Sequence, residues 1–306
     1  MSFIITGASG AFGQLATRRL LERVPASEVI LVTRNPQSLA KLAARGVTVR
    51  FGDFDRPETL RAAFAGGERM LLISTLSVGR RAEQHIRAIH AAIAAGVQHI
   101  AYTSSGGADA RNPAIVSRDH LATELALRDS GSGFTILRDS LYIEAALYQI
   151  APRALAAGKW ISNSGEGRVP LVAKDDCAAV AVAALTDDAH DGRTYEITGP
   201  EMLSYREVAA IASEIDGRPV EYVSVSDDEM AAMLAAAGVP AEYSEGMYTK
   251  GVGTSSIGDI VTYEIGVREG YFAIQSNDVE KILGRPPKSL REIFAAHPEV
   301  LRNPSI

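Results

Sequence analysis

The first half of the chain alternates short apolar runs with stretches of helical spacing, and this alternation limits its possible folds more than any other feature. The runs are rich in β-branched residues and occupy residues 3–6, 29–33, 47–51, 70–74, 99–103 and 134–137. Between them apolar side chains recur with a helical period, as in the stripe formed by Phe12, Leu15, Ala16 and Leu20. Continuously apolar strands separated by helices are typical of a parallel sheet with helices on both faces. We therefore predict an α/β domain with a doubly wound parallel sheet over residues 1–150.

Residues 151–306 show a more mixed pattern, which predicts a smaller C-terminal α/β lobe that binds the substrate. Helical spacing and strand-like runs alternate here at residues 175–185, 195–198, 205–215, 220–223 and 227–237. A strand within residues 170–198 is expected to complete the sheet of the first domain. Residues 245–270 contain six glycines without a helical or strand period, so we expect a loop or hairpin there.

Composition argues against several classes of protein. The 306 residues include 31 basic side chains scattered among 37 acidic ones, which argues against a nucleic-acid partner held by its phosphates. Cys177 is the single cysteine, which excludes an intramolecular disulfide and a cluster of thiolate metal ligands. The N-terminal segment does not resemble a signal peptide, and no run approaches the roughly 18–20 apolar residues of a membrane span. We expect a cytoplasmic protein with no metal, membrane or nucleic-acid partner.

A glycine-rich turn joins the first predicted strand to the first predicted helix. Its sequence is Gly7-Ala8-Ser9-Gly10-Ala11-Phe12-Gly13. Gly7 permits a tight turn, Gly10 lets the backbone approach a pyrophosphate, and Gly13 lets the helix pack closely on the strand. The same spacing also suits a strand-to-helix turn that merely needs small residues. Its place between a strand and a helix favours dinucleotide binding.

The end of the second strand indicates which dinucleotide is bound. An NAD site usually has an acidic residue there to bind the ribose 2′-hydroxyl. Here the strand leads into Thr33, Arg34 and Asn35, and no carboxylate occupies this position. The guanidinium of Arg34 suits a 2′-phosphate, although a solvated surface arginine would look the same in the sequence. We therefore expect NADP(H) as the cofactor.

Motifs along the whole chain resemble those of one protein family. They include T-G-A-S-G at residues 6–10, T-R-N-P at 33–36, G-D-F at 52–54, Y-T-S at 102–104, H-L-A-T-E at 120–124, Y-E-I-T-G at 195–199 and G-R-P-P-K-S-L-R-E at 284–292. On these motifs the chain is identified as a member of the NmrA-like branch of the atypical short-chain dehydrogenases/reductases, whose nucleotide-binding domain is a Rossmann fold. It is most similar to the group of NAD(P)H:quinone oxidoreductases and triphenylmethane reductases. Residues 245–270 fit the pattern of this group least well.

The resemblance implies cofactor contacts beyond the glycine turn. Asp53 and Phe54 match the pair that flanks the adenine. The stretch that matches the nicotinamide-side ribose contact follows the fourth strand and consists of Ser74, Thr75 and Leu76. The residues expected to face the site of hydride transfer end the fifth strand and are Thr103, Ser104 and Ser105. A capping or turn role is at least as common for each hydroxyl residue.

The resemblance leaves the proton donor open. Typical members of the superfamily use a Tyr-x-x-x-Lys pair, and the corresponding positions here hold Val116 and His120, a departure shared with the quinone reductase group. His120 has an ordinary pKa suited to proton donation near neutrality, and it is equally compatible with a helix-surface or ribose-contacting role. Tyr142, shortly after the sixth strand, lies where the family lines its pocket, and a packing role is an equal alternative. With Thr103, these two residues are the candidate catalytic residues.

Two functions are consistent with these features. The first is an NADPH-dependent reductase that transfers hydride to a quinone or another conjugated aromatic acceptor, with lignan- or phenylpropanoid-type compounds as a variant. The second is a non-catalytic NADP(H)-binding redox sensor of the NmrA type, which acts through a protein partner. The similarity to the reductase group and the size of the second half favour the enzyme. A small aromatic or quinone substrate is then the expected partner, and the protein is expected to be a monomer or a homodimer.

Overall fold

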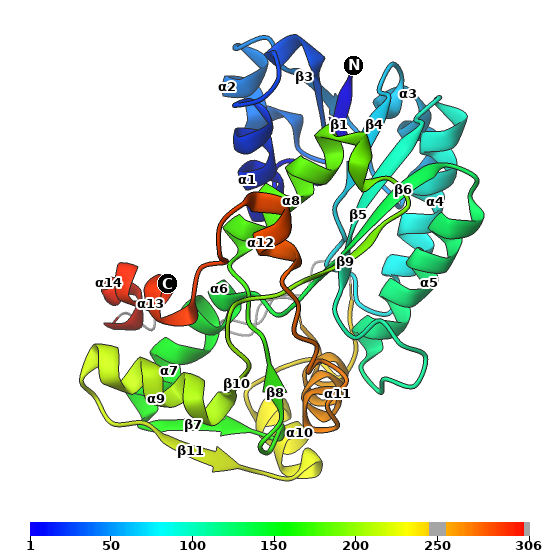
Figure 1. Ribbon diagram of the computed structural model, residues 1–306. Coiled ribbons are helices and arrows are strands. Elements are labelled where there is room, and N and C mark those ends of the chain that lie inside the picture. Colours follow the sequence, from blue (N-terminus) through cyan, green and yellow to red (C-terminus); the bar gives the residue numbers. More distant parts are fainter. Residues whose placement is uncertain (245–254, 303–306) are drawn as a thin grey trace.

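A central sheet of seven parallel strands organises the computed structural model, which describes residues 1–244 and 255–302 (Figure 1). Its strand order is β3-β2-β1-β4-β5-β6-β9. The strands are β1 (Phe3–Ile5), β2 (Val29–Thr33), β3 (Thr48–Phe51), β4 (Arg69–Leu72), β5 (His99–Ser105), β6 (Gly133–Asp139) and β9 (Thr194–Ile197). The strand order reverses at β1, which pairs with β2 on one side and with β4 on the other. Doubly wound folds bind their ligands at such a reversal.

Helices cover both faces of the sheet, and each face has its own apolar core (Figure 1). One face carries α1 (Ala11–Leu20), α2 (Ala40–Ala43), α8 (Lys174–Thr186) and α12 (Asp278–Leu283). The other carries α3 (Leu60–Phe64), α4 (Arg81–Ala94) and α5 (Ile115–Asp129). Strands buried on both faces explain why the strand sequences are continuously apolar. The predicted doubly wound α/β fold is confirmed, and its sheet includes a strand, β9, beyond residue 150.

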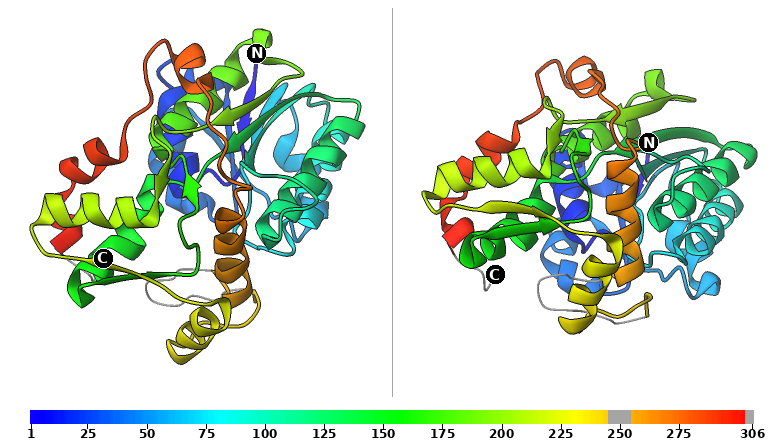
Figure 2. Two further views of the ribbon diagram at one scale, coloured as in Figure 1. Left: turned by 60° about the horizontal axis from the view of Figure 1, so that its bottom comes forward. Right: turned by 90° about the horizontal axis from the view of Figure 1, so that it is seen from below.

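The remaining elements form a second lobe around a third apolar core, on the side toward which the strands of the sheet run (Figure 2). They are α6 (Ile143–Ala145), α7 (Ala151–Ala157), β7 (Lys159–Ser162), β8 (Arg168–Val169), β10 (Leu203–Ser204), α9 (Tyr205–Asp216), β11 (Glu221–Ser224), α10 (Asp227–Ala236), α11 (Ile257–Arg268), α13 (Leu290–Ala296) and α14 (Pro298–Arg302). Strands β7 and β11 pair in parallel, and β8 and β10 pair antiparallel. Trp160 on β7 is 2% exposed and lies 6.1 Å from the Tyr205 ring, so it packs inside this lobe.

Residues 257–268 form helix α11, whereas the sequence predicted a loop or hairpin across residues 245–270. Ser256 caps this helix, because its side chain accepts a hydrogen bond from the backbone N–H of Asp259. A Cβ on Gly266 would come within 2.6 Å of Asn112 Oδ1 and 2.7 Å of the Phe272 ring. Glycine therefore serves close packing at this position, and the prediction was wrong for the described part of the segment. Residues 245–254 lie outside the described residues.

A membrane or a metal partner would each require a recognisable feature in the described residues. Within residues 1–244 and 255–302, no helix has the length and apolar character needed to cross a membrane. The same residues contain no group of three or more His, Cys, Asp or Glu side chains arranged to hold a metal ion.

Candidate functional site

The glycine turn between β1 and α1 has a backbone that only glycine fits at two positions. Gly7 has a φ of +58°, a left-handed conformation that side chains disfavour. A Cβ on Gly13 would lie 2.4 Å from the Gly7 carbonyl oxygen and 2.7 Å from Ala8 Cα. Gly10 begins the helix, and no side chain caps it. The first N–H groups of α1 therefore have no acceptor within the helix, and they are available to bind an anionic ligand at this edge of the sheet.

The end of β2 lies beside this turn. Ser9 Oγ is 2.7 Å from Thr33 Oγ1, which also accepts a hydrogen bond from the backbone N–H of Asn35 at 3.1 Å. These bonds fix the strand end against the turn. The next residue, Arg34, is exposed and makes no hydrogen bond or ion pair with any other residue in the described ranges. Its guanidinium is therefore free to bind a phosphate group at this edge.

The residues after β3 form a tight turn. The backbone N–H of Asp53 donates to Thr59 Oγ1 at 3.1 Å, and Asp53 Oδ1 accepts from the backbone N–H of Asp55 at 3.1 Å. Phe54 is half-buried against the core formed with α3, α4 and α5. One carboxylate oxygen of Asp53 thus shapes the turn, and both residues follow β3, the strand next to β2.

The segment after β4 is held from beneath by buried side chains. The backbone N–H of Ser74 donates to Thr103 Oγ1 at 2.9 Å, and that of Thr75 donates to His85 Nε2 at 3.0 Å. Thr75 Oγ1 donates to the side-chain carbonyl of Gln84 at 2.7 Å. These bonds fix the backbone and leave Leu76 67% exposed. The structure thus brings Ser74 and Thr103 together at the carboxyl edge of β4 and β5.

His120 belongs to a buried network between α4, α5 and β5. Its Nε2 lies 2.8 Å from an Arg81 guanidinium nitrogen, and its Nδ1 lies 2.7 Å from the Tyr102 hydroxyl. Arginine can only donate, so Nε2 accepts and the proton of the neutral ring is assigned to Nδ1. The same logic assigns Nδ1–H to His85, whose Nε2 accepts from Thr75. Both imidazoles are therefore neutral parts of a fixed hydrogen-bond network.

This environment corrects the expectation that His120 donates a proton near neutrality. Its side chain is 3% exposed, and burial together with the charge of Arg81 holds the pKa of His120 well below its ordinary value. The same causes lower the pKa of His85 to about 3. A ring that is neutral at pH 7 and uses both nitrogens inside the protein has no proton to give. His120 thus holds Arg81 and Tyr102 in place, and it is neither exposed on the helix surface nor free to bind a substrate.

Thr103 and Ser104 point to opposite faces of β5, as successive strand residues must. Thr103 Oγ1 faces the segment after β4, where it also lies 3.4 Å from Ser74 Oγ. Ser104 Oγ donates to Glu124 of α5 at 2.6 Å, and Glu124 is paired with Arg138 at 2.7 Å. The Ser104 side chain therefore belongs to a buried ion pair, and Thr103 is the hydroxyl that reaches the sheet edge beside Ser74.

Tyr142 lies close to the glycine turn and to groups that the sequence analysis did not single out. Its ring is 6.2 Å from that of Phe12, and Lys174 Nζ is 5.1 Å from its ring centroid. Its hydroxyl donates to Asp139 Oδ2 at 2.7 Å. Burial raises the pKa of Tyr142 well above its ordinary value, and it raises the pKa of Asp139 to about 7. An acidic residue at the end of an apolar strand was the sequence signal that could have identified Asp139.

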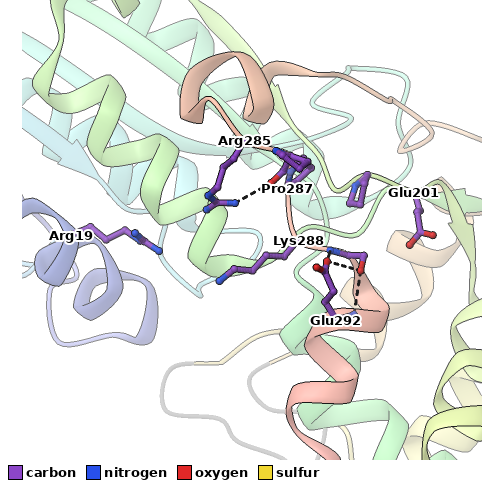
Figure 3. A pocket seen from close by; sticks show the side chains of 9 residues that line it. Arg19, Glu201, Arg285, Pro287, Lys288 and Glu292 are labelled. Carbon is purple, nitrogen blue, oxygen red and sulfur yellow. Dashed lines mark hydrogen bonds between the residues drawn. The ribbon is translucent and has the colours of Figure 1, made fainter.

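A groove of about 740 Å³ opens elsewhere, between α1, the segment after β9 and the segment that leads into α13 (Figure 3). Three basic side chains line it, and all three are paired. Arg19 and Lys288 contact Asp175 at 2.6 and 2.9 Å, and Arg285 contacts Asp176 at 2.6 Å. Arg19 lies near the C-terminal end of α1, far along the helix from the glycine turn. These pairs join the last part of the chain to α1 and α8, so the groove is not the candidate site.

Comparisons with known proteins show which family this chain is similar to. A family model described as NAD(P)H-binding matches residues 7–188. Quinone oxidoreductase 2 of Escherichia coli (strain K12) is 35% identical over 288 residues, which cover 94% of this chain and 96% of that protein. The structure of the NADPH-dependent quinone oxidoreductase QOR2 from Escherichia coli complexed with NADPH has a TM-score of 0.86 at 35% identity, covering 96% of this chain and 99% of that one. The structure of the triphenylmethane reductase of Citrobacter sp. complexed with NADP(H) has a TM-score of 0.82 at 32% identity, covering 95% of this chain and 98% of that one.

These matches confirm the family expected from the sequence motifs and the dinucleotide expected from the glycine turn. The family model spans more than half of the chain, and the relatives match along almost all of it. The chain therefore belongs to the NAD(P)H-binding family of NmrA-like oxidoreductases.

Proposed function

We propose that the protein is an NADPH-dependent reductase that transfers hydride to quinones and other flat conjugated acceptors. One observation carries the proposal. The uncapped N-terminus of α1, which begins at Gly10 and packs closely on the turn through Gly13, lies beside the end of β2, where Arg34 has no partner among the described residues. A pyrophosphate at the helix N-terminus and a 2′-phosphate at Arg34 would satisfy both features. The relatives named for quinone and triphenylmethane reduction support an aromatic acceptor.

Within this proposal the chain's own residues bind and orient. The glycine turn holds the pyrophosphate, and Asp53 and Phe54 flank the adenine. Residues 74–76 and Thr103 fix the nicotinamide side. NADPH supplies the hydride when bound. Tyr142 lies beside Phe12, where its ring can form one wall of the acceptor site.

The test follows NADPH consumption with a panel of quinones, triphenylmethane dyes and one phenylpropanoid, with NADH as the comparison. We expect quinone turnover with a preference for NADPH. Arg34→Ala removes a charge-assisted contact, so its Kd for NADPH should rise about 10–100-fold with little change for NADH. Arg61→Ala, at an exposed arginine on α3, is the matched control and should leave both constants unchanged. An equal loss for NADPH and NADH in Arg34→Ala would contradict the assignment.

A redox sensor is the second candidate, because the positions of the usual Tyr-x-x-x-Lys pair hold Val116 and a neutral His120. It predicts tight NADPH binding with no turnover of any acceptor in the panel. That result would replace the reductase and direct the search to a protein partner.

A further inference from the structure

Asp139 occupies an unusual position for an acidic residue. It ends β6 in the interior of the sheet, where its backbone neighbours are Ser105 on β5 and Ile197 on β9. Its side chain is 5% exposed and faces the core formed with α1 and α8. Tyr142 follows three positions later and covers it. The carboxyl group thus lies directly beneath a tyrosine that contacts Phe12 of the cofactor turn.

No basic group contacts this carboxyl group among the described residues. Oδ2 accepts the Tyr142 hydroxyl at 2.7 Å, whereas Oδ1 is buried without a hydrogen-bond partner. The titratable groups around Asp139 and Tyr142 come from the α6 segment and from α8, and they are Tyr142, Glu144, Lys174, Asp176 and Cys177. Lys174 lies over the Tyr142 ring. Asp176 is held by Arg285.

Glu124 shows what a buried carboxylate normally receives in this protein. It is 1% exposed, accepts two hydrogen bonds from Arg138 at 2.9 and 2.7 Å, and accepts a third from Ser104 at 2.6 Å. Asp139 has only neutral donors, the Tyr142 hydroxyl and the Cys177 thiol, where Glu124 has a guanidinium and a hydroxyl. Because a buried charge needs such partners, Asp139 is stable in its protonated form around pH 7.

The protonation state of Asp139 decides which hydrogen bond the Tyr142 hydroxyl can make. When Asp139 is ionised it is a pure acceptor, and the phenolic proton is directed into the core. When Asp139 is protonated its O–H can donate to the Tyr142 oxygen, and the phenolic O–H is then free to turn towards the sheet edge. Burial raises the pKa of Tyr142 well above its ordinary value, which disfavours the phenolate, so a proton passed on from Asp139 would keep the Tyr142 side chain neutral.

We propose that Asp139 is a positioning residue that supplies, through Tyr142, the proton taken up by the reduced acceptor. This inference rests on the proposed reductase function. The acceptor gains a hydride, with its electron pair, from NADPH, and its oxygen gains the phenolic proton of Tyr142. The Tyr142 oxygen takes the carboxyl proton of Asp139, and Asp139 is reprotonated from solvent afterwards. Two electrons and two hydrogens thus convert the quinone to the hydroquinone, and NADPH becomes NADP⁺.

The test combines kinetics with a measurement on the ligand-free protein. In the wild type, kcat/KM for a quinone should fall as pH rises through about 7, because Asp139 loses its proton. Asp139→Asn keeps the shape but cannot transfer a proton, so below that pH kcat should fall about 100-fold with the KM for NADPH unchanged, and the pH dependence should disappear. Asp228→Asn, at an exposed position of α10, is the matched control. Infrared difference spectra of the ligand-free protein across pH 7 are recorded in the Glu264→Gln background, because burial raises the pKa of Glu264 to about 7 as well. They should show a carboxylic acid band that is absent once Asp139→Asn is added.

Tyr142→Phe keeps the test decisive if Asp139→Asn does not fold. Its kcat should fall as far as that of Asp139→Asn, and its spectra should retain the infrared band. Quinone turnover in either variant with wild-type kcat and pH dependence, or a Glu264→Gln background without the band, would overturn this inference alone. A wild type that turns over no acceptor would overturn the proposed function and this inference together.

Discussion

Gly13→Ala tests whether the fit of α1 against β1 depends on the absence of a side chain. The added Cβ would lie 2.4 Å from the Gly7 carbonyl oxygen, whereas an ordinary contact begins at 3.4 Å, so the helix must retreat by about 1 Å. The clashing atoms belong to the backbone and cannot rotate away. Overpacking of this kind costs about 1–3 kcal/mol, which lowers Tm by roughly 2–4 °C for each kcal/mol in a domain of this size. The retreat also withdraws the helix N–H groups from the ligand, so the Kd for NADPH should rise at least about 10-fold.

Gly10→Ala is the matched variant, because its Cβ would lie 3.2 Å from the same carbonyl oxygen and needs only tenths of an ångström of movement. Its stability without ligand should therefore change by less than about 1 kcal/mol. Its NADPH affinity should still fall, because the methyl group occupies the space through which a pyrophosphate approaches the backbone. Thermal melts of the ligand-free proteins and calorimetric titration with NADPH separate the two effects. A Gly13→Ala variant with wild-type Tm and Kd would refute the packing argument.

Three further changes test other parts of the structure. His85→Ala removes the acceptor of the Thr75 N–H, so the unfolding free energy should fall by about 1–3 kcal/mol and NADPH should bind more weakly, as denaturant titration and calorimetry can measure. Glu124→Gln removes the carboxylate 2.7 Å from Arg138, which keeps only Glu196 at 3.1 Å, so urea unfolding should show a loss of about 1–3 kcal/mol. Burial raises the pKa of Glu264 from 4.5 to about 7, so the folded state holds this proton more tightly than the unfolded state. The contribution of Glu264 to stability should therefore fall by up to about 3 kcal/mol as pH rises from 4.5 to 7. In urea unfolding, Glu264→Gln should reduce the overall fall by that amount and leave the share of Asp139, whose pKa is also raised to about 7.

The sheet and the cofactor turn could be predicted because their physical requirements are local. A strand buried on both faces must be apolar throughout, and residues 29–33 are both the predicted and the observed β2. The turn requires a left-handed residue at Gly7 and a missing side chain at Gly13, and both requirements are visible as glycines. Helix α11 could not be predicted in this way. Gly266 looks like any other glycine in the sequence. Glycine is needed there because the helix packs closely against Asn112, which is distant along the chain, and against Phe272, which follows the helix.

His120 illustrates a different limit, because its chemistry depends on surroundings that the sequence does not state. An imidazole has an ordinary pKa suited to proton transfer at neutral pH. Here Arg81 from α4 and Tyr102 from β5 take up both ring nitrogens, and burial disfavours the charged ring. Histidine as a residue type was consistent with a general acid. Only the packing of α4 against α5 shows that the His120 ring is neutral and accepts a hydrogen bond from Arg81.

Asp139 shows how strand geometry can reverse the simplest interpretation of a sequence. Arg138 precedes Asp139 directly, and two opposite charges side by side in a sequence invite the assumption that they pair. Successive residues of a strand point to opposite faces, so Arg138 reaches Glu124 on the α5 side while Asp139 faces α8. The arginine therefore stabilises the charge of Glu124 and leaves Asp139 without a cation. One carboxyl group becomes a fixed anion and the other a group that holds a proton near pH 7, beneath the tyrosine at the cofactor turn.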